Sequence, residues 1–444
     1  MGEVHSKEEL KRALGFGDTT MVSVGAILGS GIFLVPATIA ATIHSPMLTL
    51  GLWIVGGIIS LFGALSVAEL GAAMPRSGGQ YVYLTEAYGP LWGFLYGWSS
   101  FSVINTASIA AVGVAFGEYF GYFVSLPTGG VQMVAVISII LLTTINVAGV
   151  KSGVWTQNIL TIVKVGMFGG VILLGVFLPG TESLNLLKNS GGASSLGAMG
   201  MALIAIMWTY DAWIEISYVA GEIKDPGRNI PKASLLSMVV IIAIYVLANG
   251  VFISALSIEK MADSTLVASD AAEVYLGSAG ASIIALAILI CTLGANNANV
   301  LTSARITYAM AKEKLFFRSV AKVHPKTETP ATALLIQGIW ATILTFTGSF
   351  NQLITYMVFA SWIFYGMSAG AVIILRHQKP DMERPYRVWG YPWVPAIFIL
   401  FAAWLTVNTI LEAPRDAAIG IGLILTGLPF YFFWSSRKET NEIN

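Results

Sequence analysis

The stretch VGAILGSGIF, residues 24–33, decides the fold of this 444-residue chain. It lies inside an apolar run, residues 16–41, that is long enough to cross a bilayer. The glycines on each side of Ser30 favour a break in the middle of the predicted helix. Unpaired backbone groups are tolerated in hydrocarbon only where they line a cavity or meet a ligand, so a break at this depth predicts a binding site. The second half of the broken helix would direct its first N–H groups at an anion such as a carboxylate. The alternative explanation of the two glycines and the serine is that small residues allow close packing between helices.

The composition indicates a protein that crosses the membrane several times. Hydrophobic residues make up 56% of the chain, charged residues 11%, and the net charge is zero. These values are typical of polytopic membrane proteins rather than soluble enzymes. The lipid bilayer is therefore the expected surrounding. The balanced charge, without a basic tail, argues against nucleic acid as a partner.

Apolar runs predict about twelve membrane spans, which makes the expected fold class all-α. The predicted spans are residues 16–41, 47–73, 88–124, 130–149, 155–178, 197–221, 234–256, 275–303, 331–348, 352–375, 393–411 and 416–434.

The basic residues predict the orientation of these spans. With the N-terminus in the cytoplasm, only Lys188, Lys260 and Arg415 of the 24 Lys and Arg residues fall outside, and Lys164 lies within a span. All the others, Arg305 among them, fall on the cytoplasmic side. Because cytoplasmic loops carry an excess of Lys and Arg, both termini are predicted to be cytoplasmic.

The sixth predicted span contains a second irregular stretch, WTYDAW at residues 208–213, followed by Glu215. A carboxylate at this depth costs about 2.5–3.5 kcal/mol on insertion scales, so Asp211 should face a cavity or a partner. It either caps a backbone group freed by a helix break or contacts a ligand directly. Spans one and six occupy corresponding positions in two five-helix halves of opposite orientation. Paired interruptions of this kind indicate a transporter site near the membrane midplane, which favours binding over packing for residues 29–31.

These motifs, together with AEL at residues 68–70, PRSGGQY at 75–81, Lys164 and GEIKDPGRNIP at 221–231, resemble one known family. Over nearly its whole length the chain is similar to the amino acid-polyamine-organocation transporters, and most similar to their L-type branch and to bacterial serine/threonine exchangers. The resemblance implies a LeuT-type fold with broken helices one and six. Its inverted five-helix repeats would span residues 16–178 and 197–375, two further helices residues 393–434, and cytoplasmic segments residues 1–15 and 435–444.

The resemblance also implies the activity and its residues. We expect transport of L-amino acids across the plasma membrane by alternating access, as sodium-independent exchange. The substrate carboxylate would bind the N–H groups of Ser30, Gly31 and Ile32, beside Gly29, and the ammonium would bind the carbonyls of Ile27, Trp208 and Asp211. Trp208 would be an aromatic gate.

Substrate, coupling and partners are predicted less directly. Ala212 stands where many relatives have glycine, and its methyl group favours small neutral substrates. Asp211 and Glu215 keep a cationic amino acid or polyamine exchanger open as an alternative, and proton-coupled symport is another. The single cysteine, Cys291, lies in an apolar span, so no disulfide-linked subunit is expected. The sequence predicts no cofactor or metal.

Lys164 is the basic residue left inside a span, and it has three explanations. Its ammonium could take the place of the sodium ion of sodium-coupled relatives, joining helix five to the unwound part of helix one and to helix eight. It could couple transport to protons, or it could be a packing lysine that reaches the interface.

The sequence favours a transporter over an enzyme, a pump or a channel. The stretch GMSAG, residues 366–370, satisfies the pattern of a serine nucleophile but lies in a span, and the four histidines, His5, His44, His324 and His377, fall in loops or at span ends. An intramembrane serine hydrolase needs a histidine within reach, so small-residue packing is the preferred explanation. The sequence has no phosphate-binding loop for ATP, and two localised breaks do not resemble a continuous polar pore.

Overall fold

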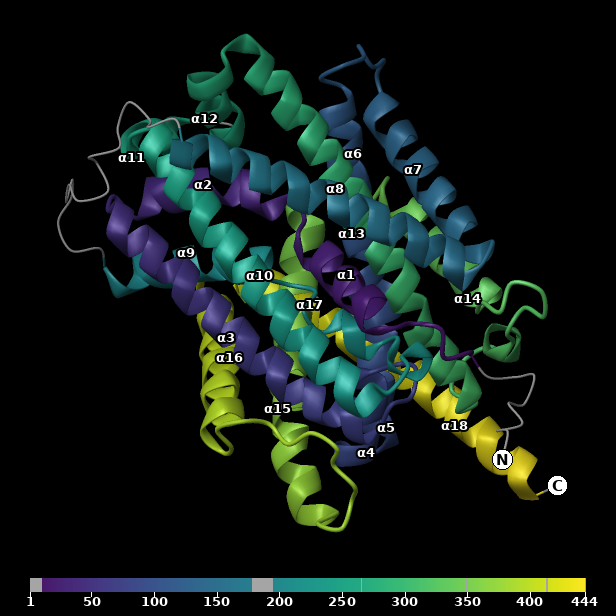
Figure 1. The fold of residues 1–444 in the computed structure, drawn as a ribbon. Coiled ribbons are helices and arrows are strands. Elements are labelled where there is room, and N and C mark those ends of the chain that lie inside the picture. The colour runs from purple at the N-terminus through teal and green to yellow at the C-terminus, as the bar shows by residue number, and fades with distance from the viewer. Residues whose placement is uncertain (1–9, 178–194, 265, 348–349, 413, 444) are drawn as a thin grey trace.

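The computed structural model describes residues 10–177, 195–264, 266–347, 350–412 and 414–443, and they form a bundle of helices (Figure 1). Within these ranges, extended backbone pairs only at a single parallel bridge between Leu14 and Ile223. The predicted all-α class is therefore confirmed. His5 and Lys188 lie outside the described residues.

The helices begin and end as follows. They are α1 (Phe16–Ile27), α2 (Gly31–Thr42), α3 (Pro46–Ala73), α4 (Gln80–Tyr88), α5 (Pro90–Ser99), α6 (Asn105–Phe120), α7 (Gly130–Val147), α8 (Val150–Phe177), α9 (Leu196–Thr209), α10 (Pro226–Ala255), α11 (Ile258–Asp263), α12 (Val267–Leu276), α13 (Ser278–Lys312), α14 (Ala331–Leu344), α15 (Phe350–Gln378), α16 (Trp393–Glu412), α17 (Pro414–Leu425) and α18 (Gly427–Ile443).

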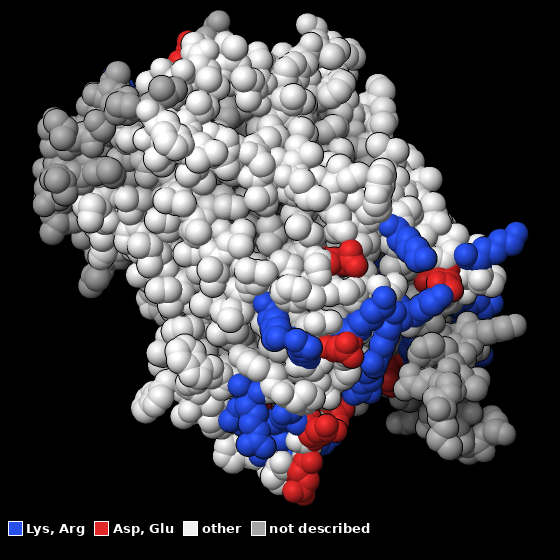
Figure 2. Space-filling view, viewed as in Figure 1, with Lys and Arg blue, Asp and Glu red and all other residues white. Residues whose placement is uncertain are grey.

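Several of these helices have the length and apolar composition of membrane-spanning helices. In the described part of the chain, nine helical stretches are long and apolar enough to cross a bilayer, and α14 and most of α9 are shorter apolar helices. A π-helical turn at Ser100–Ile104 joins α5 to α6. Charged side chains gather at one end of the face shown in Figure 2, near the start of α10 and the loop between α15 and α16. Most of the remaining visible surface is uncharged, as expected for a bundle embedded in lipid.

Small residues allow the central helices to approach closely. The half-helix α1 packs against α8, α10 and α13, and α2 packs against α9, α11 and α12. A Cβ atom at Gly25 would lie 2.0 Å from Gln157 Nε2 and 2.1 Å from Thr161 Oγ1, so α1 meets α8 where only glycine fits. Such contacts hold the first span at the centre of the bundle.

The charged end is held together by buried ion pairs. Glu222 forms a bidentate pair with Arg305, at 2.7 and 3.0 Å, and both side chains are buried. The backbone carbonyl of Glu222 also accepts hydrogen bonds from the N–H groups of Ala13 and Leu14, both at 2.9 Å. The sequence predicted Arg305 only as one of the cytoplasmic basic residues; in the structure its side chain is buried against Glu222 at the charged end, and its side of the membrane stays a prediction.

Candidate functional site

The first predicted span is broken where its glycines lie. Helix α1 ends at Ile27, the N–H group of Gly29 turns back to the Ile27 carbonyl at 2.8 Å, and α2 begins at Gly31. The first N–H groups of a helix have no carbonyl of a preceding turn to bind, so those of Gly31 and Ile32 are available to a ligand. The predicted break is confirmed.

The second irregular stretch is also a helix break. Helix α9 ends at Thr209, and short turns follow up to residue 222. Ala212 has a φ of 72°, in the left-handed region that favours glycine. The Asp211 side chain is fixed from across the bundle, because Tyr365 of α15 donates a hydrogen bond to Asp211 Oδ1 at 2.8 Å.

The two breaks face each other across a cavity of about 80 Å³. Its lining from the breaks includes six of the predicted substrate residues, namely Ile27, Gly29, Ser30, Gly31, Trp208 and Asp211. Ile32 is not among the lining residues, and its side chain is fully buried. Gly31 lies so close to the second break that a Cβ atom there would be 3.0 Å from both Thr209 Cγ2 and Thr209 Oγ1. The predicted set is thus brought together, except for the side chain of Ile32.

Other helices complete the cavity with residues that sequence analysis did not assign to the site, namely Ser108 and Val112 of α6, Ala295 and Asn299 of α13 and Met357 of α15. Beside the breaks, the lining also includes Ala26 and Thr209, together with Ala212 and Glu215, which sequence analysis linked to the choice of substrate. Glu215 is buried and accepts a hydrogen bond from Thr302 Oγ1 at 2.7 Å, and Asn299 donates to Ser108 Oγ at 2.8 Å. For the polar residues among them, the sequence offered only the presence of a polar side chain in an apolar span, and this does not reveal which way the side chain points.

Tyr245 of α10 joins the two breaks. Its hydroxyl group lies 2.8 Å from the carbonyl of Ile27 and 3.2 Å from that of Thr209. The Ile27 carbonyl therefore already has Tyr245 and Gly29 as partners, and the Trp208 carbonyl accepts from the N–H group of Asp211 at 3.2 Å. A bond from a substrate ammonium to these carbonyls stays a prediction.

Lys164 of α8 lies directly against the first break. Its Nζ donates to the carbonyls of Gly25 and Leu28, both at 2.8 Å, and its side chain is fully buried. Helix α13 closes the other side, where a Cβ atom at Gly294 would lie 2.5 Å from Lys164 Cε. Lys164 therefore makes both predicted contacts, with the first predicted span at the end of α1 and with the eighth predicted span, which is α13. The ammonium therefore serves carbonyls that the helix break leaves without intrahelical partners.

A chain of amides and a hydroxyl fixes α8 beside α1. Asn146 donates to Asn297 Oδ1 at 2.9 Å, and Asn297 donates to Gln157 Oε1 at 2.8 Å. Thr161, one turn further along α8, donates to the Met21 carbonyl of α1 at 3.0 Å. This network sets the rotation of α8 that directs Lys164 at the break.

The serine motif in α15 has a packing role. Ser368 is buried, donates to the Phe364 carbonyl at 2.8 Å and accepts from Gln80 Nε2 at 2.9 Å. The bond from Gln80 joins α15 to α4, whereas the bond to Phe364 lies within α15. Among the described residues, no group of three or more His, Cys, Asp or Glu side chains could hold a metal ion.

Two interrupted helices around a small polar cavity, inside a bundle with many apolar helices, define a multi-pass membrane transporter. The chain belongs to the amino acid permease family, whose profile matches residues 14–434.

Known relatives cover the same length. The chain is 31% identical to the b(0,+)-type amino acid transporter 1 of Mus musculus, over 98% of this chain and 91% of that protein. It is 30% identical to the serine/threonine exchanger SteT of Bacillus subtilis (strain 168), over 98% and 100%. It is 32% identical to the human large neutral amino acids transporter small subunit 2, over 97% and 82%. These relatives are transporters, so the chain is a transporter and not an enzyme, and the hydrolase alternative is set aside.

Proposed function

We propose that this protein exchanges small neutral L-amino acids across the plasma membrane by alternating access, without sodium. The observation that carries the proposal is the cavity between the two helix breaks, with the start of α2 on one side and Asp211 and Glu215 on the other. A zwitterion matches this arrangement, because N–H groups at a helix start favour a carboxylate and carboxylates favour an ammonium. Trp208, which lines the same cavity, is the proposed gate.

The size of the cavity supports small substrates. A water molecule needs about 10–15 Å³ of such space, so the roughly 80 Å³ cavity holds on the order of six water-sized groups. Serine, alanine and threonine are close to this size, whereas tryptophan is far larger. The methyl group of Ala212 lines the cavity and is one of the groups that limit it to this volume.

Lys164 supports sodium independence. Its ammonium already provides a positive charge to the carbonyls of Gly25 and Leu28, which a sodium ion would otherwise bind. In the proposed arrangement, residues 16–178 and 197–375 form inverted five-helix repeats within twelve spans, and residues 393–434 add the last two. The proposed topology places both termini, residues 1–15 and 435–444, in the cytoplasm, which would make the charged end in Figure 2 the cytoplasmic end.

One relative is named as a small subunit, which raises the question of a partner for this chain. We propose that no partner subunit is obligatory. Cys291 is fully buried in α13, so it cannot form a disulfide with another chain.

A second candidate function, exchange of cationic substrates or proton-coupled symport, is favoured by the two carboxylates, Asp211 and Glu215, that line the cavity.

The test is uptake of labelled amino acids into liposomes that contain the purified protein. Serine, alanine, leucine, arginine and putrescine are each measured with and without internal amino acid, sodium and a pH gradient. We expect uptake of serine and alanine to require internal amino acid and to be the same with and without sodium or a pH gradient. Uptake driven by a pH gradient without internal substrate, or preferred uptake of arginine or putrescine, would support the second candidate and overturn the first.

A further inference from the structure

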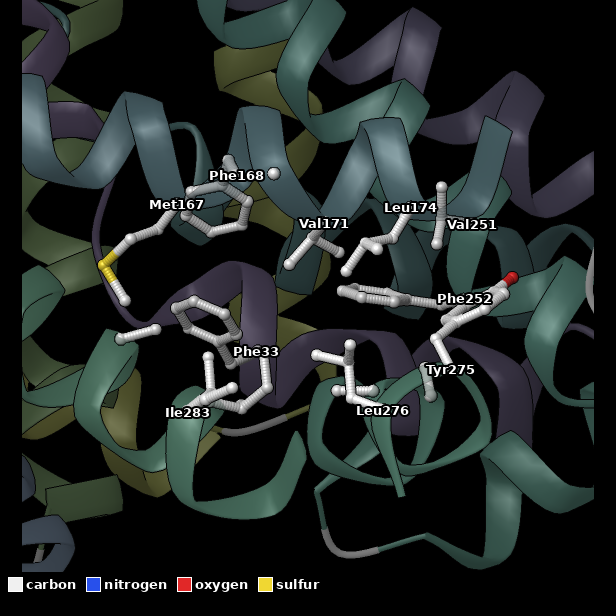
Figure 3. Close-up of a pocket in the computed structure, with 15 residues that line it drawn as sticks. Phe33, Met167, Phe168, Val171, Leu174, Val251, Phe252, Tyr275, Leu276 and Ile283 are labelled. Atoms are coloured by element: carbon white, nitrogen blue, oxygen red, sulfur yellow. The ribbon is translucent and has the colours of Figure 1, made fainter. Parts of the chain in front are cut away.

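A second cavity lies away from the substrate site, between α2, α8, α10, α12 and α13. Its volume is about 300 Å³, and we call it the crevice. Figure 3 shows side chains of α8 directed at those of α12 and α13, with Phe33 and Phe252 between them. The lining residues are Phe33, Met167, Phe168, Gly170, Val171, Leu174, Val251, Phe252, Ala271, Ala272, Tyr275, Leu276, Ile283, Ile284 and Ala287.

The lining excludes water and polar ligands. A buried water needs two to four polar partners, and apolar cavities of about 150 Å³ stay dry and bind benzene or xenon. The side chains that line the crevice are apolar, apart from the Tyr275 hydroxyl. That hydroxyl is paired with Ser254 Oγ at 3.1 Å, so no polar side-chain group of the lining lacks a partner. The crevice suits hydrocarbon.

The open side of the crevice is continuous with the lipid-facing surface. Leu276 and Ile283 on its rim are exposed, and so are Leu173 and Phe177 of α8 and Leu286 of α13 beside it. In a membrane transporter these apolar side chains face bilayer hydrocarbon. The acyl chains of membrane lipids are therefore the molecules adjacent to the opening.

We propose that the crevice binds one acyl chain of a membrane lipid. In an empty crevice the lining side chains would lack van der Waals contacts on one side. A bound acyl chain supplies these contacts, and binding it exposes no further apolar surface to water. The bound chain touches both α2 and α8, where Phe33 stacks on Phe168 with ring centroids 5.1 Å apart. Lipid occupancy thus supports the packing of α2, the half-helix that also lines the substrate cavity. This inference requires a membrane protein and does not depend on which substrate is transported.

Neighbouring glycines of α8 provide a matched pair of variants. Gly170 lines the crevice and Gly169 does not, and a Cβ atom at either position would meet nothing within 4 Å. They point about 100° apart around the helix. Gly170→Phe places a ring in the crevice, whereas Gly169→Phe makes the same change of residue type outside it.

The experiment uses the full chain in liposomes of phosphatidylcholine that carries a diazirine on one acyl chain. After illumination, labelled residues are mapped by mass spectrometry. We expect label on Phe252 and Ile284, two lining residues whose side chains are buried, in the wild type and in Gly169→Phe, and at least about a fivefold loss of that label in Gly170→Phe, because the added ring fills the space. Label on Leu173 and Phe177, which contact the surrounding lipid, should stay the same in all three proteins.

Three outcomes overturn the proposal. They are wild-type Phe252 and Ile284 without label, undiminished label on them in Gly170→Phe, and equal loss in Gly169→Phe. If Gly170→Phe elutes as aggregate in size-exclusion chromatography, Gly170→Leu replaces it against Gly169→Leu, and the wild-type label alone already decides whether lipid enters.

Discussion

Replacing Lys164 by methionine removes one charge from the centre of the bundle with little change in side-chain length. In the structure its ammonium holds the carbonyls of Gly25 and Leu28, both at 2.8 Å. In the proposed alternating-access cycle, the half-helices of the first span would move relative to α8. The two bonds therefore favour the state in which they are both formed.

The size of the effect follows from the two bonds. A hydrogen bond to a charged group contributes about 1.5–3 kcal/mol, so loss of both costs this state about 3–6 kcal/mol. If the opposite state retains one bond, the equilibrium between the states shifts by about 1.5–3 kcal/mol. At about 1.4 kcal/mol per factor of ten, the shift is roughly 10- to 150-fold. Apparent affinity scales with the fraction of protein in the competent state, so it must change differently on the two sides of the membrane.

The measurement is the half-saturating substrate concentration from each side, in proteoliposomes of known orientation and across pH. We expect Lys164→Met to change the ratio of the two values by at least about tenfold. The control is Lys151→Met on the same helix, because Lys151 is exposed and its loss should leave the ratio unchanged. An unchanged ratio in Lys164→Met, with unchanged rate and pH dependence, would show that Lys164 only packs.

Three further variants test other parts of the molecule. Gly31→Val should abolish stabilisation by amino acids in a thermal-shift assay, because its Cβ would lie 3.0 Å from Thr209 and its branches would cover the N–H groups. Trp208→Ala should lower the exchange rate at least about tenfold and equilibrium affinity less than about threefold, as removal of a gate does. Glu222→Gln should destabilise the protein by about 3–5 kcal/mol in chemical denaturation, because it leaves the buried charge of Arg305 without its partner.

Each of these variants has a matched control. Gly17→Val changes a glycine of α1 whose Cβ would meet nothing within 4 Å, and it should leave substrate stabilisation intact. Trp155→Ala removes an exposed tryptophan of α8 and should affect neither rate nor affinity. Glu328→Gln breaks an exposed ion pair with Lys11 and should cost about 0–1 kcal/mol. If a control variant shows the same loss as its test variant, the role assigned to Gly31, Trp208 or Glu222 in that test is contradicted.

The parts of the site that the sequence predicted are those with a local signal. Two glycines around Ser30 in an apolar run weaken a helix at a defined position, and α1 does end at Ile27. A lone lysine in a span must find a partner, and Lys164 finds the carbonyls freed by that break. Both inferences need only neighbouring residues and the properties of the bilayer.

The parts that were missed depend on how helices are rotated against each other. Tyr245 reaches Ile27 across 218 residues, and Asn299 and Ser108 meet across 191. A tyrosine or asparagine in an apolar span carries no sign of which face it occupies. The burial of Arg305 against Glu222 was missed for the same reason, since hydropathy does not register a partner 83 residues away.

The bonds of Lys164 also impose an order on biosynthesis. Leu28 is separated from its lysine by 136 residues, and Gly25 by 139. At about 5–20 residues per second, a ribosome needs roughly 7 to 27 s to reach Lys164 after it has made Leu28. During this interval the freed carbonyls of the first span must be served by water or by the insertion machinery, because their final partner has not yet been made. The newly made N-terminal helices therefore cannot reach their final arrangement before α8 has been made.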